Sequence, residues 1–198
     1  RYPVDIAPFV AMRDTSPESY AALRALLGPE HVGVLFTTQA LTPPAGLSVQ
    51  ISASGYQMVA TRLPAQPSGR HDFVPLTAAD APAMQELVAL TKPGPFAERT
   101  VELGTYLGVR SNGRLVAMAG ERMRLAGQVE ISAVCVHPEH RGHGYARDLI
   151  LTLMHRQIAQ GIVPMLHTFA DNAPAIALYE QIGFAIRQTL HVTGLKRT

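Results

Sequence analysis

Residues 134–146 have the sequence VCVHPEHRGHGYA and carry the most informative local signals of the chain. Its apolar start is typical of a β-strand, and the glycines at 142 and 144 predict a turn that opens into a helix. The N–H groups at a helix N-terminus lack partners and carry about half a positive charge. A strand, a glycine turn and a helix in this order indicate a cradle for a phosphate or another anion, with an ordinary glycine-rich turn as the alternative.

The elements around this stretch follow an order that predicts a mixed sheet. Two turns, Asn112-Gly113 and Ala126-Gly127, separate three strands and indicate an antiparallel meander. Next, a helix with an apolar stripe from Ala146 to Ile158 lies between two strands, which implies a parallel pair joined by a right-handed crossover. The expected elements are strands at 106–110, 115–121, 129–136, 165–169 and 184–192 and helices at about 144–160 and 173–182.

The chain divides near residue 70, because residues 63–70 contain two prolines and a glycine, the composition of a linker. Before this linker we expect a helix at 17–27 and strands at 32–37 and 47–61, the second interrupted at Ser54-Gly55. We therefore predict a small accessory α+β unit in residues 1–70 and an α/β domain in residues 71–198.

Composition excludes several classes of protein. The 198 residues have a net charge of +2 and are 47% apolar, unlike a disordered chain. The sequence contains no block of Lys and Arg residues that would predict a nucleic-acid or membrane-surface partner. The single cysteine, Cys135, excludes an internal disulfide and indicates a reducing, cytoplasmic setting.

Three segments of the chain resemble the GNAT superfamily of N-acetyltransferases. Residues 141–146, RGHGYA, match the superfamily pattern Arg/Gln-x-x-Gly-x-Gly/Ala, and residues 171–184, DNAPAIALYEQIGF, resemble its Asn-x-x-Ala-x-x-Leu-Tyr-x-x-x-Gly-Phe signature. Residues 129–136 resemble the fourth strand, and the order and spacing of all three segments agree. The resemblance covers about residues 72–194 and implies a GNAT-like α/β fold, with a mixed, mostly antiparallel twisted sheet flanked by helices.

The resemblance implies acetyl-CoA as the cofactor. The glycine turn would hold its pyrophosphate, and the fourth strand would pair with the pantetheine arm and splay from the fifth strand, leaving a slot for the thioester. A backbone N–H near Val134 or Cys135 would polarise the thioester carbonyl. The expected cofactor-binding residues are Val134, Cys135, Val136, Arg141, Gly142, His143, Gly144, Tyr145, Ala146, Asn172 and Tyr179. His137, His140 and His143 recur every third residue in this turn, where we expect contacts to phosphate and no metal.

The same resemblance assigns two catalytic residues. Tyr179 matches the usual acid, which protonates the departing CoA thiolate. Glu130, at the start of the fourth strand, is the candidate base, with a solvated carboxylate or an ion-pair partner as the alternative. Cys135 is expected to pack rather than to act as a nucleophile. His167 is a candidate acceptor-site contact or a core histidine. Residues 92–96 are a candidate acceptor wall, with Phe96 covering the slot, or a plain surface turn.

The predicted function is transfer of an acetyl group from acetyl-CoA to a primary amine by direct attack in a ternary complex. The amine belongs to a small molecule or a peptide, and a homodimer is left open. Two alternatives are transfer of a longer acyl group to an amino acid and a non-catalytic, CoA-binding regulatory module.

Overall fold

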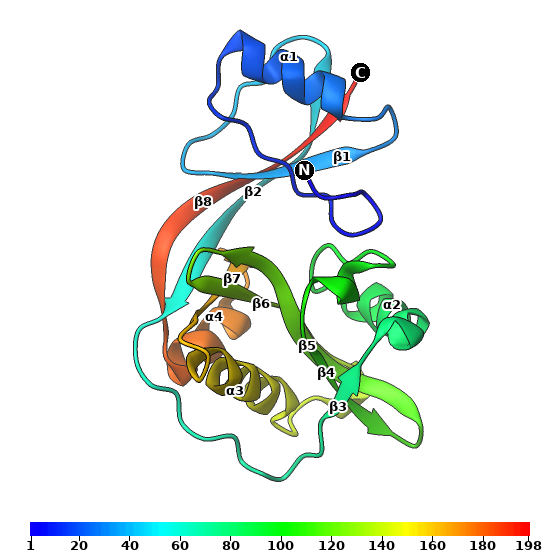
Figure 1. Cartoon of the computed structure of the whole chain (residues 1–198), viewed down its shortest axis with the longest axis vertical. Coiled ribbons are helices and arrows are strands. Elements are labelled where there is room, and N and C mark those ends of the chain that lie inside the picture. Colours follow the sequence, from blue (N-terminus) through cyan, green and yellow to red (C-terminus); the bar gives the residue numbers. More distant parts are fainter.

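Eight strands form one continuous sheet in the order β1-β8-β2-β7-β6-β5-β4-β3 (Figure 1). The computed structural model describes all residues, 1–198. The strands are β1 (Val32–Thr37), β2 (Leu47–Ala60), β3 (Val74–Leu76), β4 (Tyr106–Ser111), β5 (Arg114–Leu125), β6 (Gln128–Val136), β7 (Val163–Phe169) and β8 (Phe184–Arg197). The helices are α1 (Pro17–Leu26), α2 (Ala81–Thr91), α3 (Tyr145–Ile158) and α4 (Ala173–Ile182).

The meander and the crossover are both confirmed. Strands β4, β5 and β6 pair antiparallel, and Asn112 and Gly113 in the first turn have φ of 49° and 80°, as a tight primed turn requires. Strands β6 and β7 pair parallel, with α3 between them in the chain. The sheet is therefore mixed and mostly antiparallel, as predicted.

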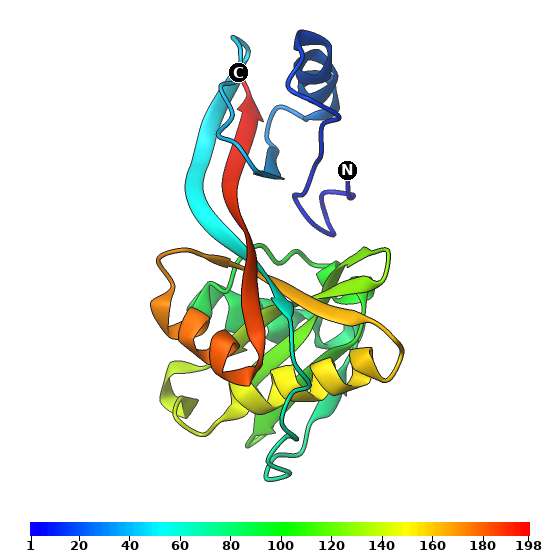
Figure 2. The ribbon, with the colours of Figure 1, turned by 90° about the vertical axis from the view of Figure 1, so that its left-hand side faces the viewer.

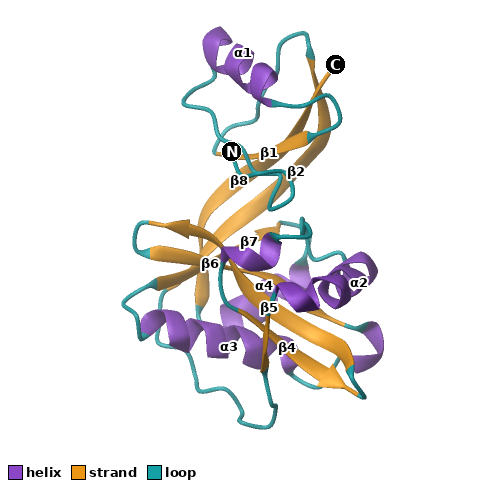
Figure 3. Ribbon diagram, turned by 45° about the vertical axis from the view of Figure 1, so that its right-hand side comes forward, coloured by secondary structure: helices purple, strands orange, loops and turns teal.

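Helices α2 and α3 cover opposite faces of β5 and β6 (Figure 3). Met84 and Leu87 of α2 pack with Leu115, while Leu149 and Leu153 of α3 belong to the cluster that includes the next strand residue, Val116. Since successive strand side chains point to opposite faces, this alternation produces two cores and fixes both helices on the sheet.

The predicted interruption of β2 at Ser54-Gly55 is wrong, because β2 runs unbroken between β7 and β8. A Cβ at position 55 would lie 3.0 Å from the Thr168 carbonyl oxygen. Gly55 therefore allows β2 and β7 to approach closely and does not form a turn.

The N-terminal residues share the sheet with the rest of the chain. Strand β2 pairs with β7 and β8, and β1 pairs with residues 191–196 of β8, so the sheet does not divide at residue 70. In Figure 2 the paired β2 and β8 extend from the lower body to the upper end, where α1 and the C-terminus lie, and the N-terminus lies below them. None of the four helices is both long and apolar enough to cross a membrane.

Candidate active site

The turn between β6 and α3 presents a row of free backbone N–H groups. Gly142 and Gly144 have φ of 81° and 82°, a left-handed conformation that strains other residues. The amides of Arg141 and Asp148 are hydrogen-bonded within the chain, whereas those of residues 142–147 have no partner in the protein. All six of these residues line a cavity of about 1020 Å³, so their amides are available to an anionic ligand.

Basic side chains surround these amides. Arg141, which forms no ion pair, lines the cavity together with Arg147, His140 and His143. The Nδ1 atom of His143 lies 3.1 and 3.0 Å from the carbonyl oxygens of residues 140 and 141 and therefore carries a hydrogen. The turn thus combines unpaired amides with cationic side chains, and its chemistry fits a pyrophosphate.

The segment before β3 forms hydrogen bonds with this turn and with the start of α3. Ser68 Oγ donates to the carboxylate of Asp148, which is only 3% exposed in the first turn of α3. Burial raises the pKa of Asp148, but the Ser68 hydrogen bonds and the nearby His71 and Arg147 outweigh it and hold that pKa below its usual value. The Nε2 atom of His71 lies 2.9 Å from the carbonyl oxygen of His143. The linker therefore supports both the helix start and the glycine turn.

The slot expected between the fourth and fifth strands of the GNAT core is present between β6 and β7. The two strands pair only from Gln128 to Glu130, opposite Val163 to Met165, and then separate. Ala133 has a φ of 52° at an irregularity in the pairing of β6 with β5, which turns the local backbone. Residues 132–136 line the cavity from this side, and they have no pairing with β7.

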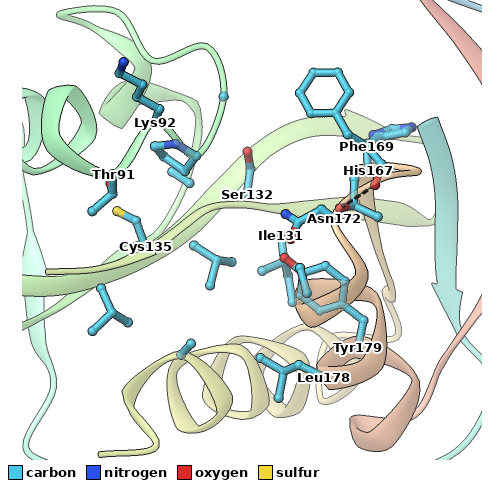
Figure 4. Close-up of a pocket in the computed structure, with 18 of the residues that line it drawn as sticks. Thr91, Lys92, Ile131, Ser132, Cys135, His167, Phe169, Asn172, Leu178 and Tyr179 are labelled. Atoms are coloured by element: carbon cyan, nitrogen blue, oxygen red, sulfur yellow. Dashed lines mark hydrogen bonds between the residues drawn. The ribbon is translucent and has the colours of Figure 1, made fainter. Parts of the chain in front are cut away.

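Tyr179 and Asn172 lie across the slot from β6 (Figure 4). Asn172 precedes α4, and Tyr179 lies on that helix beside Leu178. Burial raises the pKa of Tyr179 to about 12. The phenol therefore holds its proton at neutral pH.

Cys135 lies on the other side of the slot, next to Thr91 at the end of α2 (Figure 4). The thiol is buried, and burial raises its pKa to about 11, so that it is protonated at neutral pH. This agrees with a packing role. Residues 92–95 line the cavity as expected, but Phe96 packs against Tyr106 at 5.8 Å between ring centroids and does not cover the slot.

Glu130 lies in a buried ion pair with Arg122. Arg122 donates Nε to one carboxylate oxygen at 2.8 Å and Nη2 to the other at 2.7 Å. Burial acts to raise the pKa of Glu130, but the charge and hydrogen bonds of Arg122, with a hydrogen bond from His167, lower it to about 2. Glu130 does not line the cavity. Of the two interpretations from the sequence, its surroundings are those of an ion-pair partner.

His167 lines the cavity and is held from three sides. Its Nδ1 lies 2.8 Å from Glu130, and because a carboxylate only accepts, Nδ1 carries the hydrogen. Its Nε2 lies 3.2 Å from the amide nitrogen of Gln57, whose amide oxygen accepts from Arg187. The imidazole stacks on Phe36 with 4.7 Å between centroids. Nε2 is therefore the acceptor nitrogen of a histidine at the cavity wall.

Sequence reasoning missed the residues that hold these groups. Arg122 lies on β5 and Gln57 and Phe36 lie in the first 60 residues, where no motif pointed to the site. Only Arg122 could have been found from the sequence. It precedes the expected Ala126-Gly127 turn and Glu130 follows it, so the two residues could pair across the adjacent strands of the meander.

Comparisons with known proteins agree with this geometry. The family described as FR47-like protein matches residues 106–192. The N-alpha-acetyltransferase RimI of Mycobacterium tuberculosis is 36% identical over 120 residues, which cover 55% of this chain and 75% of that protein. A crystal structure of a putative GNAT acetyltransferase from Novosphingobium aromaticivorans has a TM-score of 0.89 and 38% identity, covering 98% of this chain and 86% of that one.

A more distant structure shares the fold alone. The ribosomal-protein-S18-alanine N-acetyltransferase of Escherichia coli has a TM-score of 0.53 and 22% identity, covering 64% of this chain and 92% of that one. The fold and these relatives define an acyltransferase. The chain belongs to the GNAT family of N-acetyltransferases, which was the family expected from residues 141–146 and 171–184.

Proposed function

We propose that this protein transfers the acetyl group of acetyl-CoA to a primary amine by direct attack within a ternary complex. The observation that carries the proposal is that the free amides of residues 142–147, the slot beside β6 and the side chain of Tyr179 all line one cavity. A single extended ligand with an anionic end and a reactive end therefore fits it.

The amides of Gly142 to Ala146, together with the charged side chain of Arg141, would bind the pyrophosphate. The backbone of residues 134–136, which has no strand partner on the β7 side, would pair with the pantetheine arm. Asn172, exposed at the start of α4, would donate to the same arm. The cofactor-binding residues expected from the sequence all line this one cavity, which supports the proposal.

The chemistry would proceed in balanced steps. The amine nitrogen bonds to the thioester carbon, and a backbone N–H near Val134 or Cys135 stabilises the oxyanion. The carbon–sulfur bond then breaks, and the departing thiolate takes the phenolic proton of Tyr179, which solvent replaces. The nitrogen would lose two protons in going from ammonium to amide: one balances, through solvent, the proton that the thiolate takes, and one is released. The net products are the amide, the free CoA thiol and one proton.

His167, rather than Glu130, would accept the amine proton. A carboxylate with a pKa of about 2, already bound by Arg122 and His167, is a poor proton acceptor. The Nε2 of His167 accepts only the neutral amide of Gln57, which a charged ammonium donor can displace. Glu130 then acts as a positioning residue, which fixes the tautomer of His167 and stabilises its protonated form.

A protein N-terminus is a second candidate acceptor. It is favoured by the 36% identity to an N-alpha-acetyltransferase over more than half of this chain. Transfer of a longer acyl group and a purely regulatory CoA-binding role are the remaining alternatives.

Binding and turnover are tested separately. Acetyl-CoA at millimolar concentration should raise Tm, because a ligand that binds only the folded state stabilises it. A panel of primary amines and an alanine-starting peptide should then release free CoA thiol. An absent Tm shift rejects the cofactor, and binding without thiol release from any amine favours the regulatory role.

A further inference from the structure

Beyond the thioester slot, the cavity ends in an apolar wall. The side chains of this wall come from the N-terminal residues, β1, β2 and β8, and they are Phe9, Val34, Phe36, Ile51, Leu190 and Val192. Phe9 and Phe36 lie outside the FR47-like segment 106–192, so the N-terminal part of this chain builds much of the wall. We call these six residues the apolar wall.

The apolar wall directly contacts the proposed proton acceptor. Phe36 stacks on His167, and Phe9 lies 5.5 Å from Phe36 between ring centroids. The Arg122 guanidinium lies 4.5 Å above the Phe9 ring. An amine that reaches His167 would therefore place the rest of its body against aromatic and aliphatic side chains.

The cavity offers nothing that would bind a second cation. No Asp or Glu is among the residues that line it, and the nearby Arg122 is already matched by Glu130. A second ammonium group on the acceptor would be buried without a partner, which is costly. The same desolvation lowers the pKa of a bound ammonium group, and the free amine is the form that attacks.

We infer that the acceptor is a monoamine with an apolar or aromatic body and no second cationic group. This inference rests on the proposed function, since it assigns the acceptor class of the same site. The N-terminal residues would then act in specificity, by supplying the surface against which the body of the amine packs.

A matched series of amines tests the inference. We expect kcat/KM to rise from ethylamine through butylamine to hexylamine, by about threefold for each added methylene. We expect 1,6-diaminohexane, which has the same chain length but carries a second ammonium group, to be on the order of 100-fold poorer than hexylamine. The charged end should raise KM more than it lowers kcat.

Three variants connect this preference to the apolar wall. Phe36→Ala should reduce the ratio of kcat/KM for hexylamine to kcat/KM for ethylamine. A general loss of catalysis would lower both values and leave this ratio unchanged. Val32→Ala is the matched control, because Val32 lies on the same strand and in the same cluster but does not line the cavity. Ile51→Glu, at a side chain that is 38% exposed, should recover activity toward 1,6-diaminohexane at least tenfold by supplying a carboxylate.

Failure of the inference differs from failure of the proposed function. The inference is overturned if the diamine is turned over as well as hexylamine or better, or if an alanine-starting peptide is acetylated and no small amine is. In either case the proposed acetyltransferase function still stands. Absence of any acetyl transfer, or of any acetyl-CoA binding, overturns the proposed function with it.

Discussion

Glu130 accepts two hydrogen bonds from Arg122, and both side chains are buried between β5, β6 and β7. His167 donates a third hydrogen bond to the same carboxylate. A carboxylate in this position cannot leave the interior to collect a proton, but it can hold an imidazole in one orientation. Glu130 therefore contributes to stability and to the orientation of His167, whereas His167 is the proposed proton acceptor. The first three predictions follow from this arrangement.

The first prediction concerns the ion pair itself. Glu130→Gln should lower the free energy of unfolding by about 3–5 kcal/mol, because it leaves the buried charge of Arg122 without a partner. The double variant Arg122→Met/Glu130→Leu should be more stable than Glu130→Gln, since it removes both charges. Urea unfolding measures each variant, and a loss below about 1 kcal/mol in Glu130→Gln would show that the pair contributes little.

The second prediction is a pH dependence of stability. The folded-state pKa of Glu130 is about 2, below the usual value of 4.5, so the unfolded chain binds more protons in this window. The resulting stabilisation is fully present above pH 4.5 and is lost as the pH falls to 2, by about 3 kcal/mol in total. Urea unfolding at several pH values should show that the free energy of unfolding depends less on pH in Glu130→Gln than in the unchanged protein. An identical dependence on pH in the two proteins would contradict the assignment.

The third prediction concerns the proton acceptor. His167→Gln should lower kcat at neutral pH by about 100-fold or more, with acetyl-CoA binding retained. The defect should shrink at a pH above the pKa of the acceptor, where the amine arrives already free of its proton. Gln57→Ala, which removes the amide that occupies Nε2, is the control and should preserve the shape of the pH profile. A defect independent of pH would assign His167 a structural role only.

The cradle and the family could be predicted from the sequence because their signals are local. Gly142 and Gly144 need positive φ wherever they stand, and the apolar stripe of α3 repeats within one helix. The surroundings of Glu130 depend on its register opposite Arg122 and on β7, which the sequence does not give. A carboxylate at a strand start is therefore compatible with a base or an ion pair until the partner strands are placed.

Gly55 and the apolar wall show the same limit of prediction from the sequence. A glycine after a serine is a turn signal in sequence, but here it allows contact with Thr168, a residue distant in the chain. Phe9 and Phe36 carry no motif. Phe36 is placed by the pairing of β1 with β8, and Phe9 by its bridge to Val34 of β1. Long-range pairing, rather than local propensity, therefore determines the acceptor side of the cavity.

The fourth prediction tests the acid. Tyr179→Phe should lower kcat by about 100-fold while the Kd for acetyl-CoA changes little, because the ring is kept and only the proton donor is lost. Burial keeps Tyr179 protonated, with a pKa of about 12, so activity should not fall from its ionisation below pH 10. Tyr56→Phe, at another tyrosine of the cavity, is the control. Equal turnover of both variants would remove Tyr179 from the acid role.

The fifth prediction concerns the linker behind the cradle. Ser68→Ala removes the hydrogen bond to Asp148 and loosens the first turn of α3, so the Kd for acetyl-CoA should rise about threefold to tenfold. The effect should be larger for CoA than for a pantetheine thioester that lacks the pyrophosphate, since only the cradle is disturbed. Ser48→Ala, which loses a hydrogen bond to Lys196 at the far end of β2, is the matched control. Equal weakening of both ligands would mean that the linker supports the slot generally and not the phosphate turn.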